Sequence, residues 1–463
     1  MIEVSILEKK NINLSNRIDA EYYEKKLLDK ESRLKIKGDS LGNLFEEETK
    51  KFKDIIKKEV TFNYLEISSI NINNGTYVTE DIEWKNAPSR AQKIGYKDQI
   101  AISTVRPYRS SVALIAEDCV CTSGLVIFKS KKNVTTKELF VYFKSKLFID
   151  QITRRTRATM YPAVDNSDFK ELIIPKINKD LKDRIEIDIE EKLKIELSLI
   201  KCEKEIEEVC LKFINNYFKK IKIDDYQKTS ISVLNKKDLL SKETNRLDSE
   251  YYQNFHNEME LLFKKNDNYE ILSNIFDYID TGSTPAKKYQ TENNQSDYFI
   301  LKASCLTNFG LNWSKIENVT KDYFNLHPSK KISINDILIL SAAHSPEQIG
   351  KKISQISDID KDYTNTISVG ELITLKNTNL KSDYSNFVLN YLRSRYGYIQ
   401  IQRLIRGITS HLYPQDVKKI KIPKPNNDVI KKISEITKKI NNLRNKRDKL
   451  ISTLIENYNN QTL

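Results

Sequence analysis

The sequence has 463 residues, a formal net charge of +13 at pH 7, and 39% hydrophobic residues. This length predicts three or four domains at about 100–200 residues each. No apolar run reaches the ~18 residues of a membrane span, and the first residues lack the basic and apolar regions of a signal peptide. We therefore expect a cytoplasmic protein with no membrane partner, whose five cysteines are reduced thiols.

The positive charge favours an anionic partner, of which nucleic acid is the simplest. A lysine-rich chain from an AT-biased genome would also be basic. The charge alone therefore leaves two interpretations open, a nucleic-acid-binding protein and a compositional bias.

Several short strings occur twice in the chain. NRIDAEYY at 16–23 returns as NRLDSEYY at 245–252, identical at six of eight positions. DFKELIIPK at 168–176 returns as DVKKIKIPK at 416–424, identical at five of nine. Five further pairs, Tyr161-Pro162 with Tyr413-Pro414 among them, keep the same order at offsets between 227 and 252. This order predicts an internal duplication, with a period far above the ~20–50 residues of solenoid repeats.

Each half begins with the pattern of a mixed domain. Residues 60–130 and 295–376 contain short runs rich in Ile, Val, Tyr and Phe, interrupted by Gly, Asn, Pro and Ser, which is typical of strands. A helix-like stretch follows each, at 136–155 and 384–405. We predict an α+β domain in each half.

A long helix is predicted after each domain, because residues 178–222 and 426–458 carry apolar residues at helical spacing and contain neither Gly nor Pro. The apolar stripe of the first is Leu181, Ile185, Ile189, Leu193, Leu197, Ile200, Ile206, Cys210, Ile214 and Tyr217. The second has heptad spacing in Ile433, Ile440, Arg447 and Leu454 and in Ile436, Leu443 and Leu450. A single helix cannot bury its own stripe, so we predict that the two pack as an antiparallel coiled coil or on partner helices.

This order of domain, long helix, domain and long helix resembles the specificity subunit of type I restriction–modification systems. DTGSTPAKKY at 280–289 is similar to the Gly-x-Thr-Pro loop of that family's recognition domains, and RGITSHLYPQDVKKIKIPKP at 406–425 to their closing element. VRPYRSSVAL at 105–114 looks like a second variant of the domain. The first half departs from the pattern, since it lacks the Gly-x-Thr-Pro loop and has EEETKKFKDII there instead.

The resemblance implies two homologous target-recognition domains in a pseudo-twofold repeat. The first would be residues 1–176, and residues 223–425 would contain a linker and the second. Conserved helices at 177–222 and 426–463 would follow the two domains. Each domain would read one part of a bipartite site in double-stranded DNA. The helices would dock two methyltransferase subunits and, for phage defence, restriction–translocase subunits. We expect no cofactor in this chain, with S-adenosylmethionine, ATP and Mg²⁺ on those partners.

The motifs of the relevant enzymes are missing. The sequence has no P-loop, no Pro-Pro dipeptide of the kind that holds a flipped base in amino-methyltransferases, and no histidine pair with metal-ligand spacing. We therefore expect a chain without catalysis of its own. Two alternatives stay open: a diverged methyltransferase or nuclease, and a coiled-coil adaptor that binds protein instead of DNA.

Candidate DNA contacts are basic clusters interleaved with aromatic residues. Arginine can contact guanine edges and phosphates. The alternative for every cluster is a solvated surface face. The candidates are Arg106, Tyr108, Arg109, Arg154, Arg155 and Arg157 in the first half, and Lys287, Lys288, Tyr289, Arg403, Arg406 and His411 in the second.

Overall fold

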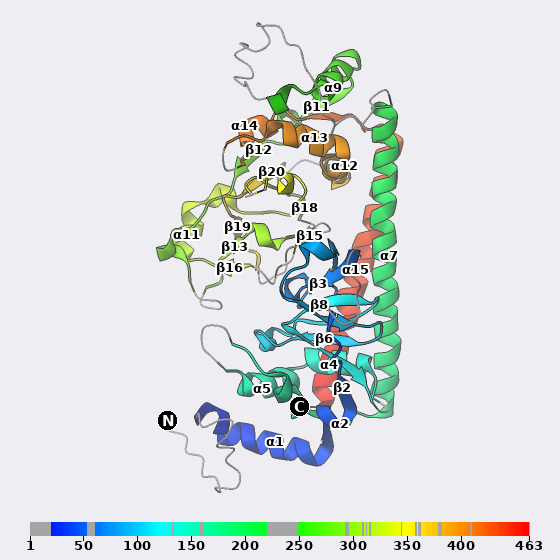
Figure 1. Ribbon diagram of the computed structural model, residues 1–463, viewed down its shortest axis with the longest axis vertical. Coiled ribbons are helices and arrows are strands. Elements are labelled where there is room, and N and C mark those ends of the chain that lie inside the picture. The colour runs from blue at the N-terminus through cyan, green and yellow to red at the C-terminus, as the bar shows by residue number, and fades with distance from the viewer. Residues whose placement is uncertain are drawn as a thin grey trace. The chain divides into compact units, whose positions relative to one another are not determined.

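A computed structural model gives the fold of the chain, which forms two compact units (Figure 1). Unit 1 comprises Met1–Leu199 with Asn442–Leu463, and unit 2 comprises Ile200–Asn441. The boundary falls inside the two longest helices, α7 (Lys179–Tyr217) and α15 (Asn427–Thr462). The structure describes residues 20–52, 61–131, 134–157, 162–219, 249–291, 296–307, 310–311, 313, 316–343, 345–356, 359, 363–377, 382–407 and 410–462.

Unit 1 contains a four-stranded antiparallel sheet in the order β2-β9-β6-β7 and a mixed sheet in the order β4-β3-β8-β5. Its strands are β1 (Gly38–Ser40), β2 (Phe45–Glu47), β3 (Thr61–Leu65), β4 (Glu80–Glu83), β5 (Ala91–Gly95), β6 (Ile100–Ser103), β7 (Val112–Leu114), β8 (Cys119–Thr122), β9 (Leu125–Ser130) and β10 (Ile173–Pro175). Its other helices are η2 (Ala20–Tyr23), α1 (Lys25–Lys37), α2 (Leu41–Leu44), η3 (Ile67–Ser69), η4 (Trp84–Asn86), η5 (Pro107–Arg109), α4 (Thr136–Lys144), α5 (Lys146–Arg155) and α6 (Asn166–Lys170).

Unit 2 contains a four-stranded sheet in the order β12-β20-β17-β18 and a three-stranded sheet in the order β16-β13-β19. Its strands are β11 (Tyr269–Ile271), β12 (Tyr278–Thr281), β13 (Phe299–Leu301), β14 (Leu306–Thr307), β15 (Gly310–Leu311), β16 (Glu317–Asn318), β17 (Ile337–Leu340), β18 (Ile353–Gln355), β19 (Thr366–Ser368), β20 (Leu372–Lys376) and β21 (Lys421–Pro423). Its other helices are η7 (Ser249–Tyr252), α9 (Asn254–Lys265), α10 (Leu272–Ile275), η8 (Lys287–Tyr289), η9 (Ala303–Cys305), α11 (Lys321–Leu326), η11 (Pro328–Lys330), η12 (Pro346–Gln348), α12 (Ser382–Arg393), α13 (Arg395–Leu404) and α14 (Pro414–Val417).

The four-stranded antiparallel sheets of the two units, β2-β9-β6-β7 and β12-β20-β17-β18, have corresponding strand orders. In both four-stranded sheets every neighbouring pair is antiparallel. The second sheets differ in size but share one arrangement: β3 has β8 as a parallel neighbour and β4 as an antiparallel one, and β13 has β19 and β16 in the same relation. A mixed α/β fold with a long helix, predicted from the strand runs and the helix-compatible segments, is confirmed.

The repeated Ile-Pro-Lys string forms the last strand before each long helix. β10 pairs with β1, and β21 pairs with β11, both antiparallel. A glutamine side chain, buried in unit 1 and half-buried in unit 2, holds each strand: the Gln151 amide donates to the Ile173 carbonyl over 2.9 Å, and the Gln400 amide donates to the Lys421 carbonyl over 3.0 Å. Each side-chain oxygen accepts the N–H of the same strand residue. The proline at the end of each strand lacks an N–H donor. One further backbone hydrogen bond follows it, from the Lys176 N–H to the Lys37 carbonyl over 3.2 Å and from the Lys424 N–H to the Asn268 carbonyl over 3.0 Å, before each long helix begins.

Part of the predicted stripe of α7 is wrong. Leu197 is 67% exposed and Ile200 is 51% exposed, whereas Lys192, Ile195 and Leu199 are buried. Four successive steps of four residues advance about 400° each, so each step drifts about 40° around a helix of 3.6 residues per turn. By Leu197 the extrapolated stripe has left the packed face. The buried positions run in steps of three and four from Lys192 to Ile206, and then in steps of four to Phe218.

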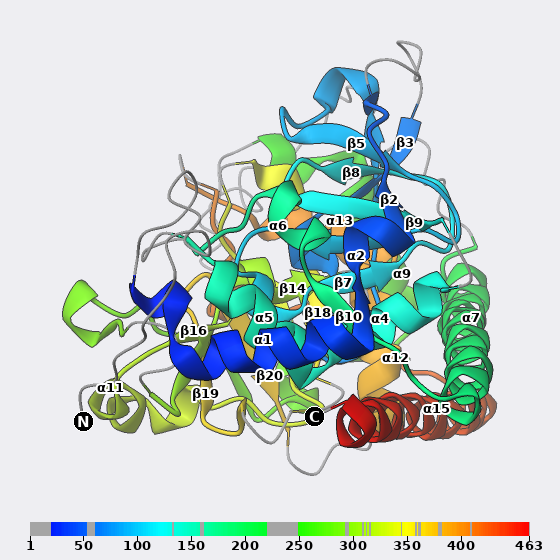
Figure 2. The same cartoon turned by 90° about the horizontal axis from the view of Figure 1, so that it is seen from below.

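Within unit 1, α7 and α15 lie side by side (Figures 1 and 2). Lys446 of α15 donates to the Glu191 carboxylate of α7 over 2.6 Å. Near the start of α7, the N–H of Asn178 donates to Gln461 over 3.3 Å. Residue numbers thus rise along one helix while they fall along the other.

No described helix is long and apolar enough to cross a membrane. All five cysteines lie among the described residues, are buried, and form no disulfide.

Candidate nucleic-acid interface

The first predicted cluster lies on a turn after β6 whose ends have unusual backbone conformations. Arg106 has φ 47° and Ser110 has φ 53°, both left-handed, on either side of η5. Such conformations are uncommon outside glycine and persist where the surroundings fix them. The Ser110 hydroxyl donates to the Phe143 carbonyl over 2.6 Å, and the Lys144 ammonium donates to the Ser110 carbonyl over 2.8 Å. The turn is therefore anchored on α4.

A second segment is joined to this turn through the backbone. Arg157 and Ala163 exchange two hydrogen bonds of 2.8 and 3.0 Å, and the Arg106 N–H donates to the Pro162 carbonyl over 2.7 Å. Ala163 also bridges Val105. The structure thus brings the Arg106 turn and Arg157, which are far apart in the sequence, onto adjoining backbone segments.

The side chains of this region retain exposed surface. Arg106, Tyr108 and Arg109 are half-buried, and the Arg157 side chain is 36% exposed. Arg157 pairs with the Asp165 and Asp168 carboxylates. Asp168 also accepts the N–H of Asp165 over 2.8 Å in the capping box of α6. The carboxylates therefore orient a guanidinium that still reaches the surface.

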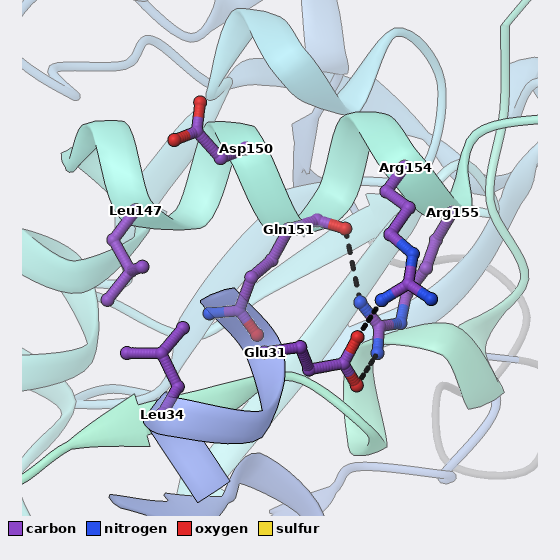
Figure 3. Close-up of a pocket in the computed structure, with 7 residues that line it drawn as sticks. All are labelled: Glu31, Leu34, Leu147, Asp150, Gln151, Arg154 and Arg155. Atoms are coloured by element: carbon purple, nitrogen blue, oxygen red, sulfur yellow. Dashed lines mark hydrogen bonds and ion pairs between the residues drawn. The ribbon is translucent and has the colours of Figure 1, made fainter. Parts of the chain in front are cut away.

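Arg154 and Arg155 are placed differently from the prediction. Their side chains are only 5% and 2% exposed, and both guanidinium groups pair with Glu31 of α1. Figure 3 shows both directed at that carboxylate. The prediction that they contact DNA is not supported, because their donors are used inside unit 1. The run of basic residues itself did not indicate this pairing, since Glu31 lies more than a hundred residues earlier.

Unit 2 contains a corresponding pair of segments. Arg406 and His411 exchange two backbone hydrogen bonds of 3.0 and 2.9 Å. The Leu412 N–H donates to the Ser341 carbonyl over 2.8 Å, so this segment joins the one after β17, as its counterpart joins the segment after β6. The structure therefore brings Arg406 and His411 together.

Three side chains at this place in unit 2 stack. The Arg406 guanidinium lies 5.2 Å from the centre of the Tyr413 ring, and the His411 ring stacks on the same tyrosine at 6.2 Å. Arg406 also pairs with Asp416, as Arg157 pairs with Asp168. Half-exposed arginine and aromatic groups of this kind suit contacts to phosphates and bases.

Arg403 repeats the placement of Arg154. Its side chain is 15% exposed, donates to the Tyr251 carbonyl over 3.0 Å, and pairs with Glu260 over 3.4 Å. The predicted DNA contact of Arg403 is likewise not supported, because its donors face the protein.

The third cluster lies on η8. Lys287 and Lys288 are exposed, and the Lys288 ammonium lies 4.8 Å from the Tyr289 ring. The loop before η8 is close to β19: a Cβ on Gly282 would lie 2.1 Å from the Ser368 carbonyl oxygen. Only glycine fits there, which accounts for this residue in the Gly-Ser-Thr-Pro segment.

A polar network under this loop was not predicted. The Tyr323 hydroxyl donates to the Ser283 hydroxyl over 2.8 Å, and His327 Nε2 lies 3.0 Å from the same oxygen. His327 Nδ1 lies 2.9 Å from the Tyr323 carbonyl, so it carries the proton and Nε2 accepts from Ser283. No sequence signal connects Ser283 with Tyr323 and His327, which follow it by 40 and 44 positions.

Residues 16–19 and 245–248 of the Asn-Arg strings and Tyr161 lie outside the described residues. The Tyr-Pro match is a misalignment, because Tyr413 precedes α14 at the position that Asp165 occupies before α6. In the described part of the chain, no group of three or more His, Cys, Asp or Glu side chains could hold a metal ion.

No family model and no curated protein matches the chain. The chain is similar to solved structures of type I restriction–modification proteins. One comes from work on the assembly and conformational transition of the type I system, with 15% identity over 90% of this chain and 96% of that one, and a TM-score of 0.30. The HsdS subunit of Thermoanaerobacter tengcongensis has 15% identity over 92% and 94%, and a TM-score of 0.30. The S subunit of M. genitalium has 14% identity over 90% and 94%, and a TM-score of 0.32.

Proposed function

We propose that this chain is the DNA-recognition subunit of a type I restriction–modification complex. Each unit reads one half of a bipartite site in double-stranded DNA, and the two recognition domains are related by an approximate twofold. The chain itself performs no catalysis.

One observation carries the proposal: both units present the same constellation of two backbone-joined segments with a half-exposed arginine. In unit 1 it contains Arg106 and Arg157, and in unit 2 it contains Arg406 and His411. A duplicated surface suits a ligand with two similar parts, and the net charge of +13 suits a polyanion.

The chemistry of these groups assigns their roles. Arg109, Lys287 and Lys288 would neutralise phosphates and so bring the chain onto DNA in a salt-dependent manner. Arg106, Arg157 and Arg406 would donate to base edges, where a bidentate pair with guanine gives about 1–3 kcal/mol of discrimination. The Arg157 and Arg406 carboxylate partners limit the directions in which each guanidinium can donate.

The long helices would form the frame for partner subunits. The opposed contacts of α7 and α15 in unit 1 support an antiparallel coiled coil. On this frame we place two methyltransferase subunits and the restriction–translocase subunits. S-adenosylmethionine, ATP and Mg²⁺ belong to those partners.

Selection from a random duplex pool tests the proposal. The full chain, alone and as the complex recovered with it from its host, is mixed with duplexes that contain 30 random base pairs, and bound DNA is sequenced. We expect two short fixed motifs separated by unspecified base pairs.

The other outcomes identify the alternatives. No enrichment at any salt concentration would favour a protein-binding adaptor. Methyl transfer from S-adenosylmethionine by the purified chain alone would favour a diverged methyltransferase.

A further inference from the structure

Arg154 belongs to a cluster between α1 and α5, which also includes Tyr22, Glu31 and Arg155. The guanidinium of Arg154 lies 4.3 Å from the Tyr22 ring and donates to the Tyr22 carbonyl over 2.6 Å. It also pairs with Glu31, and Arg155 reaches the same carboxylate over 3.2 Å. One buried arginine therefore holds both η2 and α1 against the end of α5, and Figure 3 shows its pairing with Glu31.

Unit 2 has the same cluster between α9 and α13. Arg403 lies 4.2 Å from the Tyr251 ring and donates to the Tyr251 carbonyl over 3.0 Å. It pairs with Glu260 over 3.4 Å. The tyrosine precedes the carboxylate by nine residues in both units, so the whole arrangement is part of the duplication.

The second cation of the cluster differs in its origin. Arg155 has Leu404 as its counterpart, which cannot pair with a carboxylate. In unit 2 the second cation comes from β21, where Lys421 donates to Glu260 over 2.5 Å. Arg155 in unit 1 and Lys421 in unit 2 thus each supply the second cation, so that in both units one carboxylate lies between two cations. This substitution indicates that the ion-pair geometry, and not one residue type, is what both units keep.

The position of each cluster gives its role. Arg154 stands three residues before Arg157, and Arg403 stands three residues before Arg406. α5 ends at Arg155 and α13 ends at Leu404, so each cluster holds the helix end from which the candidate DNA-contacting segment departs. The Arg157–Ala163 and Arg406–His411 backbone pairs follow directly.

We propose that Arg154 and Arg403 are positioning residues for the DNA-contacting segments of their own units, acting through Glu31 and Glu260, and do not touch DNA. This inference rests on the proposed function. It makes α1 and α9 parts of the recognition apparatus, since each carries the carboxylate that fixes a segment more than a hundred residues later.

Hydrogen–deuterium exchange on the full chain tests the positioning directly. Glu31→Gln should raise amide exchange at Arg157 and Ala163 at least tenfold and leave Arg406 and His411 unchanged. Asp29→Asn is the matched control, because it removes one exposed carboxylate from the same helix. In unit 2, Glu260→Gln should act on Arg406 and His411 only, with Glu258→Gln as its control.

Selection from the random duplex pool then tests the consequence. Glu31→Gln should lower base discrimination at least tenfold in one half of the site and leave the other half intact, and Glu260→Gln should do the converse. The salt dependence of binding should stay the same, because no phosphate contact is removed.

The outcomes are distinguishable. In one outcome, amide exchange rises at the segment in the variant's own unit, but even the wild type selects no motif from the pool. This result would overturn the proposed function but not the positioning. A fall in stability of the whole unit, with exchange at Arg157 and Ala163 rising no more than elsewhere, would overturn the positioning. A flatter salt dependence for Arg154→Gln than for Glu31→Gln would also overturn it, because Arg154 would then touch phosphate.

Discussion

Lys144 should make the stability of unit 1 depend on pH. Its side chain is buried on α4, and its ammonium donates to the carbonyls of Ile72 over 2.6 Å and Ser110 over 2.8 Å. It therefore supports the left-handed end of the turn that carries Arg106 and Arg109. Burial, with the charge of Lys192 nearby, lowers the pKa of Lys144 from 10.5 to about 7.

The sign follows from proton binding. Between pH 7 and 10.5 the unfolded chain keeps a proton on Lys144 that the folded chain has released. Unfolding then takes up a proton, so the free energy of unfolding rises with pH in this window. Uptake of one proton raises the free energy of unfolding by up to about 1.4 kcal/mol per pH unit, and by about 5 kcal/mol at most over the whole window. The neutral amine still has N–H donors for both carbonyls, so these hydrogen bonds persist.

Urea unfolding from pH 7.5 to 9.5 measures the effect. Trp84 in unit 1 is one of two tryptophans in the chain, so its fluorescence in a Trp313→Phe background reports unit 1. Across this pH range, the free energy of unfolding of the wild type should rise by up to about 3 kcal/mol more than that of Lys144→Met. Lys146→Met, at an exposed position, should follow the wild type. A difference between wild type and Lys144→Met that is constant with pH would refute the argument.

Three further changes give separate expectations. Replacing Arg106 and Arg109 with Gln should weaken DNA binding. It should also reduce the slope of log K against log salt by about 0.9 for each phosphate that the variant no longer neutralises. An unchanged slope would mean that this turn does not bind phosphate. Gly282→Ala places a methyl group against the Ser368 carbonyl, 2.1 Å away before relaxation, and should abolish base selection in one half-site only, as the duplex pool reports. Gln151→Leu leaves two buried backbone groups of β10 without partners, so urea unfolding should show unit 1 destabilised by about 2–4 kcal/mol. Gln151→Glu at low pH should show only part of this destabilisation.

The matching strings and the long helices could be found from the sequence because both depend only on residues that are close together in the chain. Colinear strings do not depend on packing, and apolar residues repeated at helical spacing over a long segment without Gly or Pro predict a long helix. The helix bounds at Lys179 and Asn427 follow closely from these rules.

Which arginine side chains are buried in ion pairs and which reach the surface could not be predicted. Arg154 and Arg157 stand in one run of basic residues, yet Arg154 is buried against Glu31 and Arg157 reaches the surface. The difference depends on which carboxylate the fold brings near, and that carboxylate is distant in sequence. The duplication offered the one available signal, because Glu31 and Glu260 hold matching places after the repeated Glu-Tyr-Tyr.

The central claim is that each unit reads its own half of a bipartite DNA site. Replacing residues 20–176 with a second copy of 249–424 gives a chain with two identical recognition domains, and selection from the random duplex pool then reports what it reads. The account predicts that one half of the original motif disappears and that the remaining half appears twice, as an inverted repeat. A folded chain that still selects the original two-part motif, or that selects neither half, would contradict it.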